Sequence, residues 1–174
     1  MMLLSKYNAC ICEGSSEQAI IELLIEDGRL IFSYEDLLEE QVLRCRDAKT
    51  FEERYLRKGF DDKITVFRIL DSRREKFRLR PVYADKVSVV NVITAPEIEM
   101  LLILSEGKYT DFKKKKQKPS DFCKTVLHHK DVKCYEFIRN YFADTEKLVA
   151  AIREYKRITQ RHKDELTLAD LLKD

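Results

Sequence analysis

Short apolar runs alternate with longer amphipathic segments along the chain. Three runs have the length and composition of buried strands, over residues 7–12, 64–70 and 87–93, and the last has five Val or Ile in seven residues. A shorter run at residues 30–33 also fits a strand. After the first run, apolar residues recur at helical spacing up to Gly28, which is a natural helix end.

Further helices are predicted where a capping residue precedes helical spacing. They are expected over residues 33–43, 50–58, 94–106, 120–128, 132–142 and 145–158, and in a short segment from Thr167. Residues 72–80 fit either a charged helix or a loop that ends at Pro81. Strands that alternate with helices predict an α/β fold, with a mainly parallel sheet, crossover helices and a helical C-terminal third.

The length and composition favour one globular domain over residues 1–174. An α/β core is expected at 6–106 and a basic loop with a helical extension at 107–174. No apolar run is long enough for a signal peptide or a membrane span, so we expect a cytoplasmic protein without a membrane partner. The 5 cysteines fit no disulfide or zinc spacing, which favours buried, reduced thiols.

Charge is distributed unevenly. Residues 106–133 hold nine lysines and four acidic residues, a local charge of +5; since the whole chain carries +2, the remainder carries −3. The densest part of this segment is predicted to be a loop that either faces water or binds the phosphate backbone of nucleic acid. Its candidate contacts are Lys113, Lys114, Lys115, Lys116 and Lys118. The flanking Tyr109 and Phe112 would either stack on bases or anchor the loop to the core.

Acidic residues follow the predicted strands. Glu13 follows the first strand, Asp71 follows the strand at 64–70, and Glu97 and Glu99 follow the strand at 87–93. Ligands of open α/β sheets bind at the carboxyl ends of the strands, so these acids, Glu13 and Asp71 among them, are expected to converge at one edge of the sheet. Oxygen ligands of this kind suit Mg²⁺.

The segment Glu13-Gly14-Ser15-Ser16-Glu17, directly after an apolar strand, resembles the opening signature of TOPRIM domains. These domains occur in topoisomerases, primases, small ribonucleases and phage-defence nucleases related to the overcoming-lysogenization-defect enzymes. The resemblance covers residues 6–106 and implies that Glu13 is an acid/base or metal-associated group. It also implies that Asp71 corresponds to the first Asp of an Asp-x-Asp motif that holds Mg²⁺. The segment from Pro96 to Leu102 is similar to a helix start in compact bacterial TOPRIM-like proteins.

The chain departs from this pattern at Arg73, which stands where the second Asp is expected. Glu75 or Glu99 would have to replace the missing ligand, with Glu17 in support. The resemblance then implies a nuclease or related phosphoryl-transfer enzyme, dependent on Mg²⁺ or Mn²⁺, that acts on DNA or RNA, with a role in bacterial defence or in RNA or DNA processing. Arg73 would join the lysines in binding nucleic acid.

Two alternatives remain at the level of sequence. A catalytically degenerate TOPRIM-like domain would serve as a binding or regulatory subunit beside a partner protein. The acids also have structural interpretations: Asp71 as a helix N-cap, and Thr94 with Glu97 as a capping box, which makes Glu99 the preferred acid of that segment.

Overall fold

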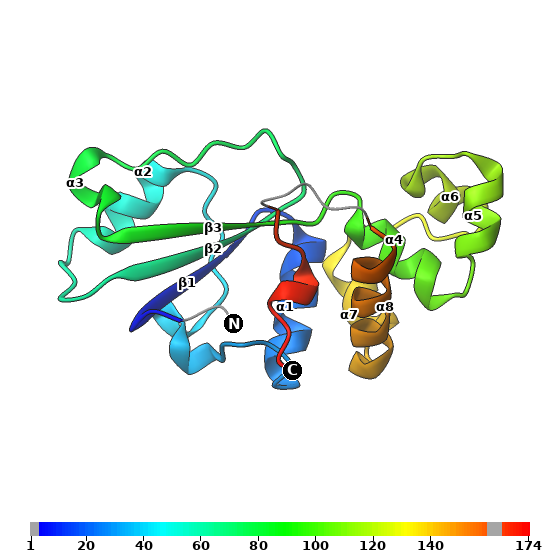
Figure 1. Cartoon of the computed structure of the whole chain (residues 1–174), viewed down its shortest axis with the longest axis horizontal. Helices are drawn as coiled ribbons and strands as arrows, with labels where there is room; N and C mark the ends of the chain where they lie inside the picture. Colours follow the sequence, from blue (N-terminus) through cyan, green and yellow to red (C-terminus); the bar gives the residue numbers. More distant parts are fainter. Residues whose placement is uncertain (1–3, 160–164) are drawn as a thin grey trace.

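A sheet of three parallel strands, in the order β1-β2-β3, lies at one end of the computed structural model, which describes residues 4–159 and 165–174 (Figure 1). The strands are β1 (Tyr7–Cys12), β2 (Ile64–Leu70) and β3 (Val87–Ile93). The α-helices are α1 (Ser15–Glu26), α2 (Ala48–Phe51), α3 (Pro81–Ala84), α4 (Glu97–Ser105), α5 (Tyr109–Lys115), α6 (Pro119–Thr125), α7 (Tyr135–Tyr141) and α8 (Thr145–Ile158). Short 3₁₀ turns are η1 (Tyr34–Asp36), η2 (Leu38–Glu40) and η4 (Leu168–Asp170), and η3 (Glu52–Leu56) is a π-helical turn.

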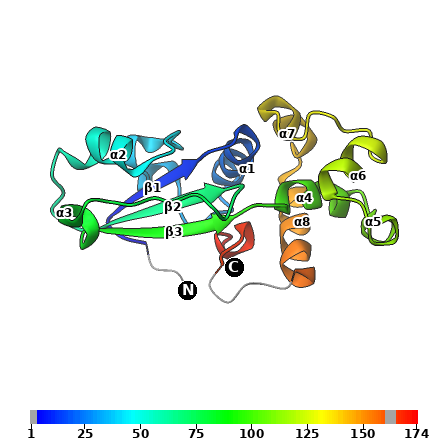
Figure 2. The same cartoon turned by 90° about the horizontal axis from the view of Figure 1, so that it is seen from above.

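The pairing register brings the carboxyl ends of the strands to one edge. Cys12 pairs with Ile69, and Leu70 pairs with Ile93. All three strands point toward α1 and α4 and away from α3 (Figure 2). The residues that follow β1, β2 and β3 therefore meet beside the first turns of these two helices.

Both faces of β1 and β2 are buried, which explains why these strands are largely apolar, whereas β3 exposes Ser88 and Asn91. Cys10 and Cys12 point to the face that packs against α1 and the C-terminal helices. Their neighbours Ala9 and Ile11 point to the opposite face, against Phe51 of α2. The alternation follows from the two-residue repeat of a strand.

The outer edges of the sheet are covered by irregular segments. Along β1, isolated bridges join Asn8 to Leu37 and Ile11 to Leu43. Along β3, Val92 bridges to Leu166, and the amide of Ile93 donates to the carbonyl of Leu166 at 2.9 Å. Covered edges leave few free backbone groups for pairing with another chain.

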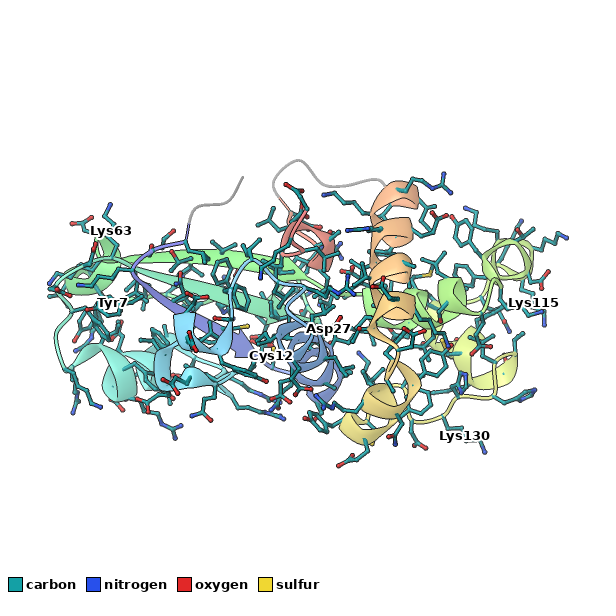
Figure 3. All side chains as sticks on the ribbon, turned by 90° about the horizontal axis from the view of Figure 1, so that it is seen from below. Tyr7, Cys12, Asp27, Lys63, Lys115 and Lys130 are labelled. Carbon is teal, nitrogen blue, oxygen red and sulfur yellow. The ribbon has the colours of Figure 1, made fainter. Side chains whose placement is uncertain are left out.

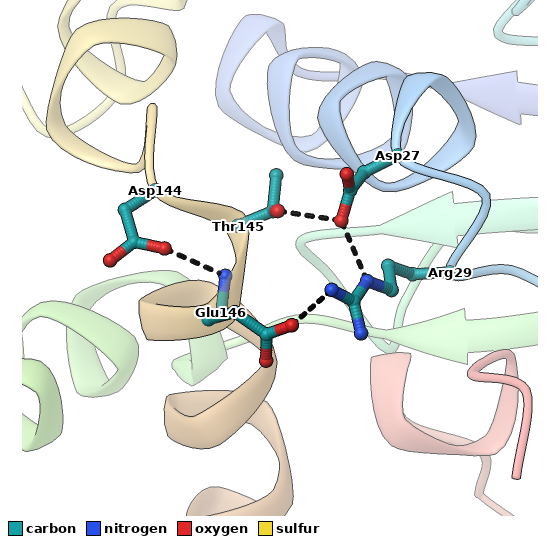
Figure 4. Close-up of polar contacts among 5 residues, drawn as sticks. All are labelled: Asp27, Arg29, Asp144, Thr145 and Glu146. Carbon is teal, nitrogen blue, oxygen red and sulfur yellow. Dashed lines mark hydrogen bonds and ion pairs between the residues drawn. The ribbon is translucent and has the colours of Figure 1, made fainter.

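Polar contacts join the end of α1 to the start of α8 (Figure 4). Thr145 Oγ1 donates to Asp27 Oδ2 at 2.7 Å, and Arg29 bridges Asp27 and Glu146. Asp144 caps α8 by accepting from the amide of Glu146 at 3.1 Å. These contacts tie the C-terminal helices to the first crossover helix and so fix them beyond the carboxyl edge of the sheet.

The α/β class, the parallel sheet and the helical C-terminal third are confirmed. Several local predictions are wrong. The strand predicted at residues 30–33 makes one bridge, from Leu30 to Leu172. The helix predicted over residues 33–43 is replaced by η1 and η2, because Glu39 and Glu40 adopt positive φ values that interrupt a helix. The helix predicted from Thr50 begins earlier, as α2. Its N-cap is Asp47, whose side chain accepts from the amide of Thr50. Thr94 does not cap α4; its hydroxyl donates to the carbonyl of Leu70 at 2.9 Å.

The lysine-rich segment is a helix and not the predicted loop. Lys113, Lys114 and Lys115 form the last turn of α5, and Lys116 ends it in the left-handed region. Lysine is a good helix former, and its charge suits a helix C-terminus. Phe112 anchors the helix, with its ring 5.4 Å from that of Phe122 in the core. Of the two roles considered for Phe112, the structure supports anchoring.

None of the helices within residues 4–159 and 165–174 combines the length and apolar character needed to cross a bilayer.

Candidate functional site

A pocket of about 220 Å³ lies at the carboxyl edge of the sheet. It is lined by Glu13, Gly14, Arg46, Asp71 and Glu75. Two of the acids follow the adjacent strands β1 and β2, and Glu75 comes from the loop after β2. The strand-end prediction for Glu13 and Asp71 is therefore correct in placement, while their chemical roles stay predictions.

Glu13 is nearly buried, with 10% of its side chain exposed. Burial raises the pKa of its carboxyl group above the usual value, and the Glu75 and Asp71 carboxylates add to this effect, against the opposing charges of Arg68 and Arg46. Repulsion between neighbouring carboxylates is relieved by a cation. The pocket therefore brings together mutually repelling carboxylates that Arg46 and Arg68 compensate in part.

Arg68 in β2 is the internal counter-ion of Glu13. Its side chain is 1% exposed, and Nη2 lies 3.2 Å from Glu13 Oε1. Nη1 donates to Asn91 at 3.3 Å, and the guanidinium group lies 4.6 Å from the ring centre of Phe77. Nε is buried and has no hydrogen-bond partner among the described residues. Arg68 therefore holds Glu13 in place at the cost of one unsatisfied donor.

Glu17 lies behind the pocket rather than in its wall. Its carboxylate is 1% exposed and accepts from Ser16 Oγ at 2.9 Å. The hydroxyl of Thr94 lies 3.4 Å from the other carboxylate oxygen. Glu17 thereby links the start of α1 to the segment between β3 and α4, so its position indicates a supporting role for the turn that carries Glu13.

Gly14 is required for this arrangement. A Cβ at position 14 would lie 1.9 Å from Glu17 Oε2. The backbone of Gly14 is extended, with φ −96°, so the requirement is steric and does not come from the backbone conformation.

We expect Gly14→Ala to lower the free energy of unfolding by about 1–3 kcal/mol, because it overpacks a buried site. In a Glu17→Ala background the additional cost of Gly14→Ala should disappear, since the clashing carboxylate is gone. Gly28→Ala is the control: Gly28 has a φ of +64° and no atoms near its missing Cβ, so its cost should be the same in both backgrounds. Urea denaturation of the variants measures these differences, and a cost at position 14 that is independent of Glu17 would contradict the steric explanation.

Glu99 and Asp71 share a cation from the chain itself. Lys133 Nζ lies 3.8 Å from Asp71 Oδ2 and 3.8 Å from Glu99 Oε1. Glu99 is largely buried in α4, with 10% of its side chain exposed. Glu97, for which a capping role was predicted, is fully buried and accepts from the amide of Leu168 at 3.4 Å.

Arg73 faces another acid instead of the pocket. Its guanidinium group forms two hydrogen bonds with Glu165, at 2.7 and 3.0 Å, and donates to the carbonyl of Ala95 at 3.3 Å. These contacts tie the loop after β2 to the C-terminal segment. Half of the Arg73 side chain is exposed, so one side of it still reaches solvent.

The predicted metal ligands do not form one compact cage. Within residues 4–159 and 165–174, no group of three or more His, Cys, Asp or Glu side chains is arranged to surround a single ion. Glu13, Asp71 and Glu75 share the pocket, Glu99 reaches Asp71 through Lys133, and Glu17 stands behind the turn.

The lysines of α5 lie away from this pocket. Lys113, Lys114, Lys115, Lys116 and Lys118 are exposed on the α5–α6 unit. Figure 3 places Lys115 at the end of the molecule opposite Lys63, which precedes β2. We call these five lysines the basic face.

Three cationic residues of the site were not predicted from the sequence: Arg46, Arg68 and Lys133. A signal existed for Arg68, because a charged residue in the middle of an apolar strand that is buried on both faces needs a partner. Arg46 and Lys133 lie in irregular segments, and neither carries a local signal that would distinguish it from a surface residue.

Comparison of the chain with protein-family models, with curated proteins and with solved structures finds no match. The site is therefore interpreted from its own residues.

Proposed function

We propose that the chain binds Mg²⁺ or Mn²⁺ in the pocket of Glu13, Asp71 and Glu75 and acts on nucleic acid as a metal-dependent nuclease or related phosphoryl-transfer enzyme. The observation that carries the proposal is the pocket itself, which is lined together by acids from two adjacent strand ends and the following loop. The TOPRIM-like assignment, and the role in phage defence that it implies, belong to the same proposal and are supported by the turn from Glu13 to Glu17.

The acids of the pocket offer the oxygen donors that a hard divalent cation prefers. All three acids offer oxygen, and Mg²⁺ is usually held by one or two carboxylates while it keeps several waters. Glu13 and Asp71 suffice as protein ligands on this pattern, with Glu75 beside them. Bound there, the ion would supply charge neutralisation at a phosphodiester and a more acidic water. Glu13, whose pKa is raised, suits proton transfer at the same edge.

Cations around the pocket suit an anionic substrate. Arg46 lines it, and Lys133 lies beside Asp71. The basic face would add contacts to the phosphate backbone at a distance from the pocket, which strengthen binding without reading sequence.

A second candidate function is a binding or regulatory subunit without catalysis. The observation that favours it is the pairing of the acids with cations of the chain: Glu13 with Arg68, and Asp71 with Lys133. Arg73, which stands where the second Asp of the Asp-x-Asp motif is expected, also favours a domain without catalysis.

Metal binding separates the two functions. Mg²⁺ at a hundredfold excess over its Kd would stabilise the native state by about 2.7 kcal/mol. For a chain of this size that is a rise of about 5–10 °C in melting temperature. Glu13→Gln and Asp71→Asn should abolish the rise, and with it any cleavage of single- or double-stranded DNA or RNA.

Glu13→Gln should leave the fold intact, because the glutamine oxygen can still accept a hydrogen bond from the buried Arg68 while the charge that the pocket disfavours is removed. The raised pKa of Glu13 means that its charged form is disfavoured in the native state. Its contribution to stability is fully present below the unfolded pKa of 4.5 and is lost as the pH rises through the higher native value, so the two proteins should converge at acid pH.

Exposed acids serve as matched controls: Glu53→Gln in η3 and Asp85→Asn before β3 should keep the metal response. A wild-type melting temperature that ignores Mg²⁺ and Mn²⁺, without cleavage, would favour the binding subunit.

A further inference from the structure

The segment that leads from β2 to α3 is irregular and strongly basic. Figure 1 shows it running back along the sheet, from the carboxyl edge to α3. We call residues 72–80 the arginine segment, because its nine residues hold four arginines, one lysine and one acid, a charge of +4. The lysine-rich stretch at 106–133 takes 28 residues to reach +5. Positive charge is therefore denser in the arginine segment than in the stretch that contains the basic face.

Apolar side chains hold the backbone of the arginine segment against the sheet. Phe77 and Leu79 are partly buried in the apolar cluster on the face opposite α1. The ring centre of Phe77 lies 5.9 Å from that of Phe51. Lys76 and Arg78, which alternate with these apolar residues, are exposed. The cations are thus presented on a backbone that is already packed in place, which lowers the entropic cost of binding a partner.

The cations in the middle of the segment have no acidic partner. The first and last arginines of the segment are paired with Glu165 and Glu52, respectively. The three cations between them are exposed, and residues 4–159 and 165–174 supply no ion pair or side-chain hydrogen bond to any of the three. These unpaired cations are Arg74, Lys76 and Arg78. Their mutual repulsion would be relieved by a polyanion.

The row of unpaired cations starts at the pocket described above. Glu75 lines the pocket and stands in the chain between Arg74 and Lys76. Arg46 adds a cation to the pocket wall. The basic face lies on the α5–α6 unit, away from the pocket. The arginine segment is therefore a positive surface that is continuous with the pocket.

The chemistry of this surface fits a nucleic-acid strand. A guanidinium group pairs with a phosphate through two parallel hydrogen bonds, and phosphates repeat along a strand as the exposed cations repeat along the segment. Surfaces that enter a membrane, and the centres of protein interfaces, rely instead on apolar side chains. Among the residues that the structure describes, Val82 is the one large apolar side chain that is exposed.

We infer that the arginine segment binds the phosphate backbone of DNA or RNA and leads the strand to the pocket. Arg74, Lys76 and Arg78 make the contacts, and Phe77 and Leu79 keep them in place. Contacts of this kind strengthen binding without reading sequence. The inference rests on the proposed function only in taking nucleic acid as the ligand, because this binding needs neither a metal nor cleavage.

The test is fluorescence anisotropy of the whole chain with labelled DNA and RNA, single-stranded and duplex, in EDTA and over a range of salt concentrations. A variant that combines Arg74→Gln, Lys76→Gln and Arg78→Gln should bind at least about tenfold more weakly at low salt. On duplex DNA, the loss of three phosphate contacts should lower the slope of log affinity against log salt by up to about 2.7. A loss on either DNA or RNA supports the inference.

A second triple variant with the same loss of charge is the matched control: Lys63→Gln, Lys86→Gln and Arg153→Gln. All three residues are exposed. Lys63 and Lys86 directly precede β2 and β3, at the other edge of the sheet, and Arg153 lies in α8. This variant should bind nucleic acid like the wild type. Melting curves establish that both triple variants are folded.

The outcomes separate this inference from the proposed function. Equal losses in the two triple variants would overturn the role of the arginine segment and leave the proposed nuclease standing. Binding to phosphatidylserine vesicles but to no nucleic acid, lost in the arginine variant, would assign the surface to a membrane and overturn the inference. A loss confined to the arginine variant, in a protein that neither responds to Mg²⁺ nor cleaves, would keep this surface and refute the nuclease. If the wild type binds neither DNA nor RNA, both fail.

Discussion

Replacing Arg68 with alanine is expected to lower the free energy of unfolding by about 3–5 kcal/mol, since removal of one partner of a buried ion pair leaves the other uncompensated. Glu13 would lose its guanidinium partner at 3.2 Å while it remains 10% exposed. The substitution also removes the contact with Phe77 and opens a void in the central strand. Urea denaturation monitored by circular dichroism would measure the effect.

Arg73→Ala is the control for this prediction. Arg73 also pairs with a glutamate, at 2.7 Å, but half of its side chain is exposed. Exposed ion pairs contribute about 0–1 kcal/mol, so Arg73→Ala should cost far less than Arg68→Ala. Arg68→Met, which keeps the apolar stem against Phe77, should fall between the two. Equal costs for Arg68→Ala and Arg73→Ala would show that the buried pair does not carry the stability assigned to it.

Neutralising the basic face should weaken nucleic-acid binding by at least about tenfold at low salt. Changing Lys113, Lys114, Lys115 and Lys116 to glutamine removes up to four phosphate contacts, each of which contributes about 0.9 to the slope of log affinity against log salt on duplex DNA. The slope should therefore fall by as much as about 3.6. Fluorescence anisotropy with labelled DNA and RNA over a range of salt concentrations measures both quantities.

A variant with the same loss of charge elsewhere controls for net charge. Lys49 lies in α2, Lys58 follows η3, and Lys63 and Lys86 directly precede β2 and β3; all four are exposed. Figure 3 places Lys63 at the end of the molecule opposite Lys115. Their replacement by glutamine should leave the salt slope close to that of the wild type. If both quadruple variants lose affinity alike, binding depends on overall charge and not on the basic face. If the wild type shows no salt-dependent binding, the lysines only face water.

β1 and β2 were predictable because each is a largely apolar run that is buried on both faces, and β3 because it is rich in Val and Ile, although Ser88 and Asn91 are exposed. The carboxyl edge followed from them, and with it the meeting of Glu13 and Asp71. These features depend on short-range patterns and on the general rule for parallel sheets.

The errors lie where tertiary contacts override local pattern. Glu39 and Glu40 have helical propensity, yet they adopt positive φ in a segment held against β1 by Leu37 and Leu43. Lys133 reaches Asp71 and Glu99 only because the loop before α7 folds back to the sheet edge. No local sequence pattern predicts the path of this loop. Arg73 is similar: its partner, Glu165, is 92 residues further along the chain.

The C-terminal segment has a consequence for how the protein is made. Leu171 accepts from the amide of Ile31, and the amide of Lys173 donates to the carbonyl of Arg29, so backbone groups just after α1 find partners near residue 172. Domains generally fold as units during synthesis. The loop after α1 therefore stays incompletely hydrogen-bonded until residues 171–173 have been synthesised and have folded back against it.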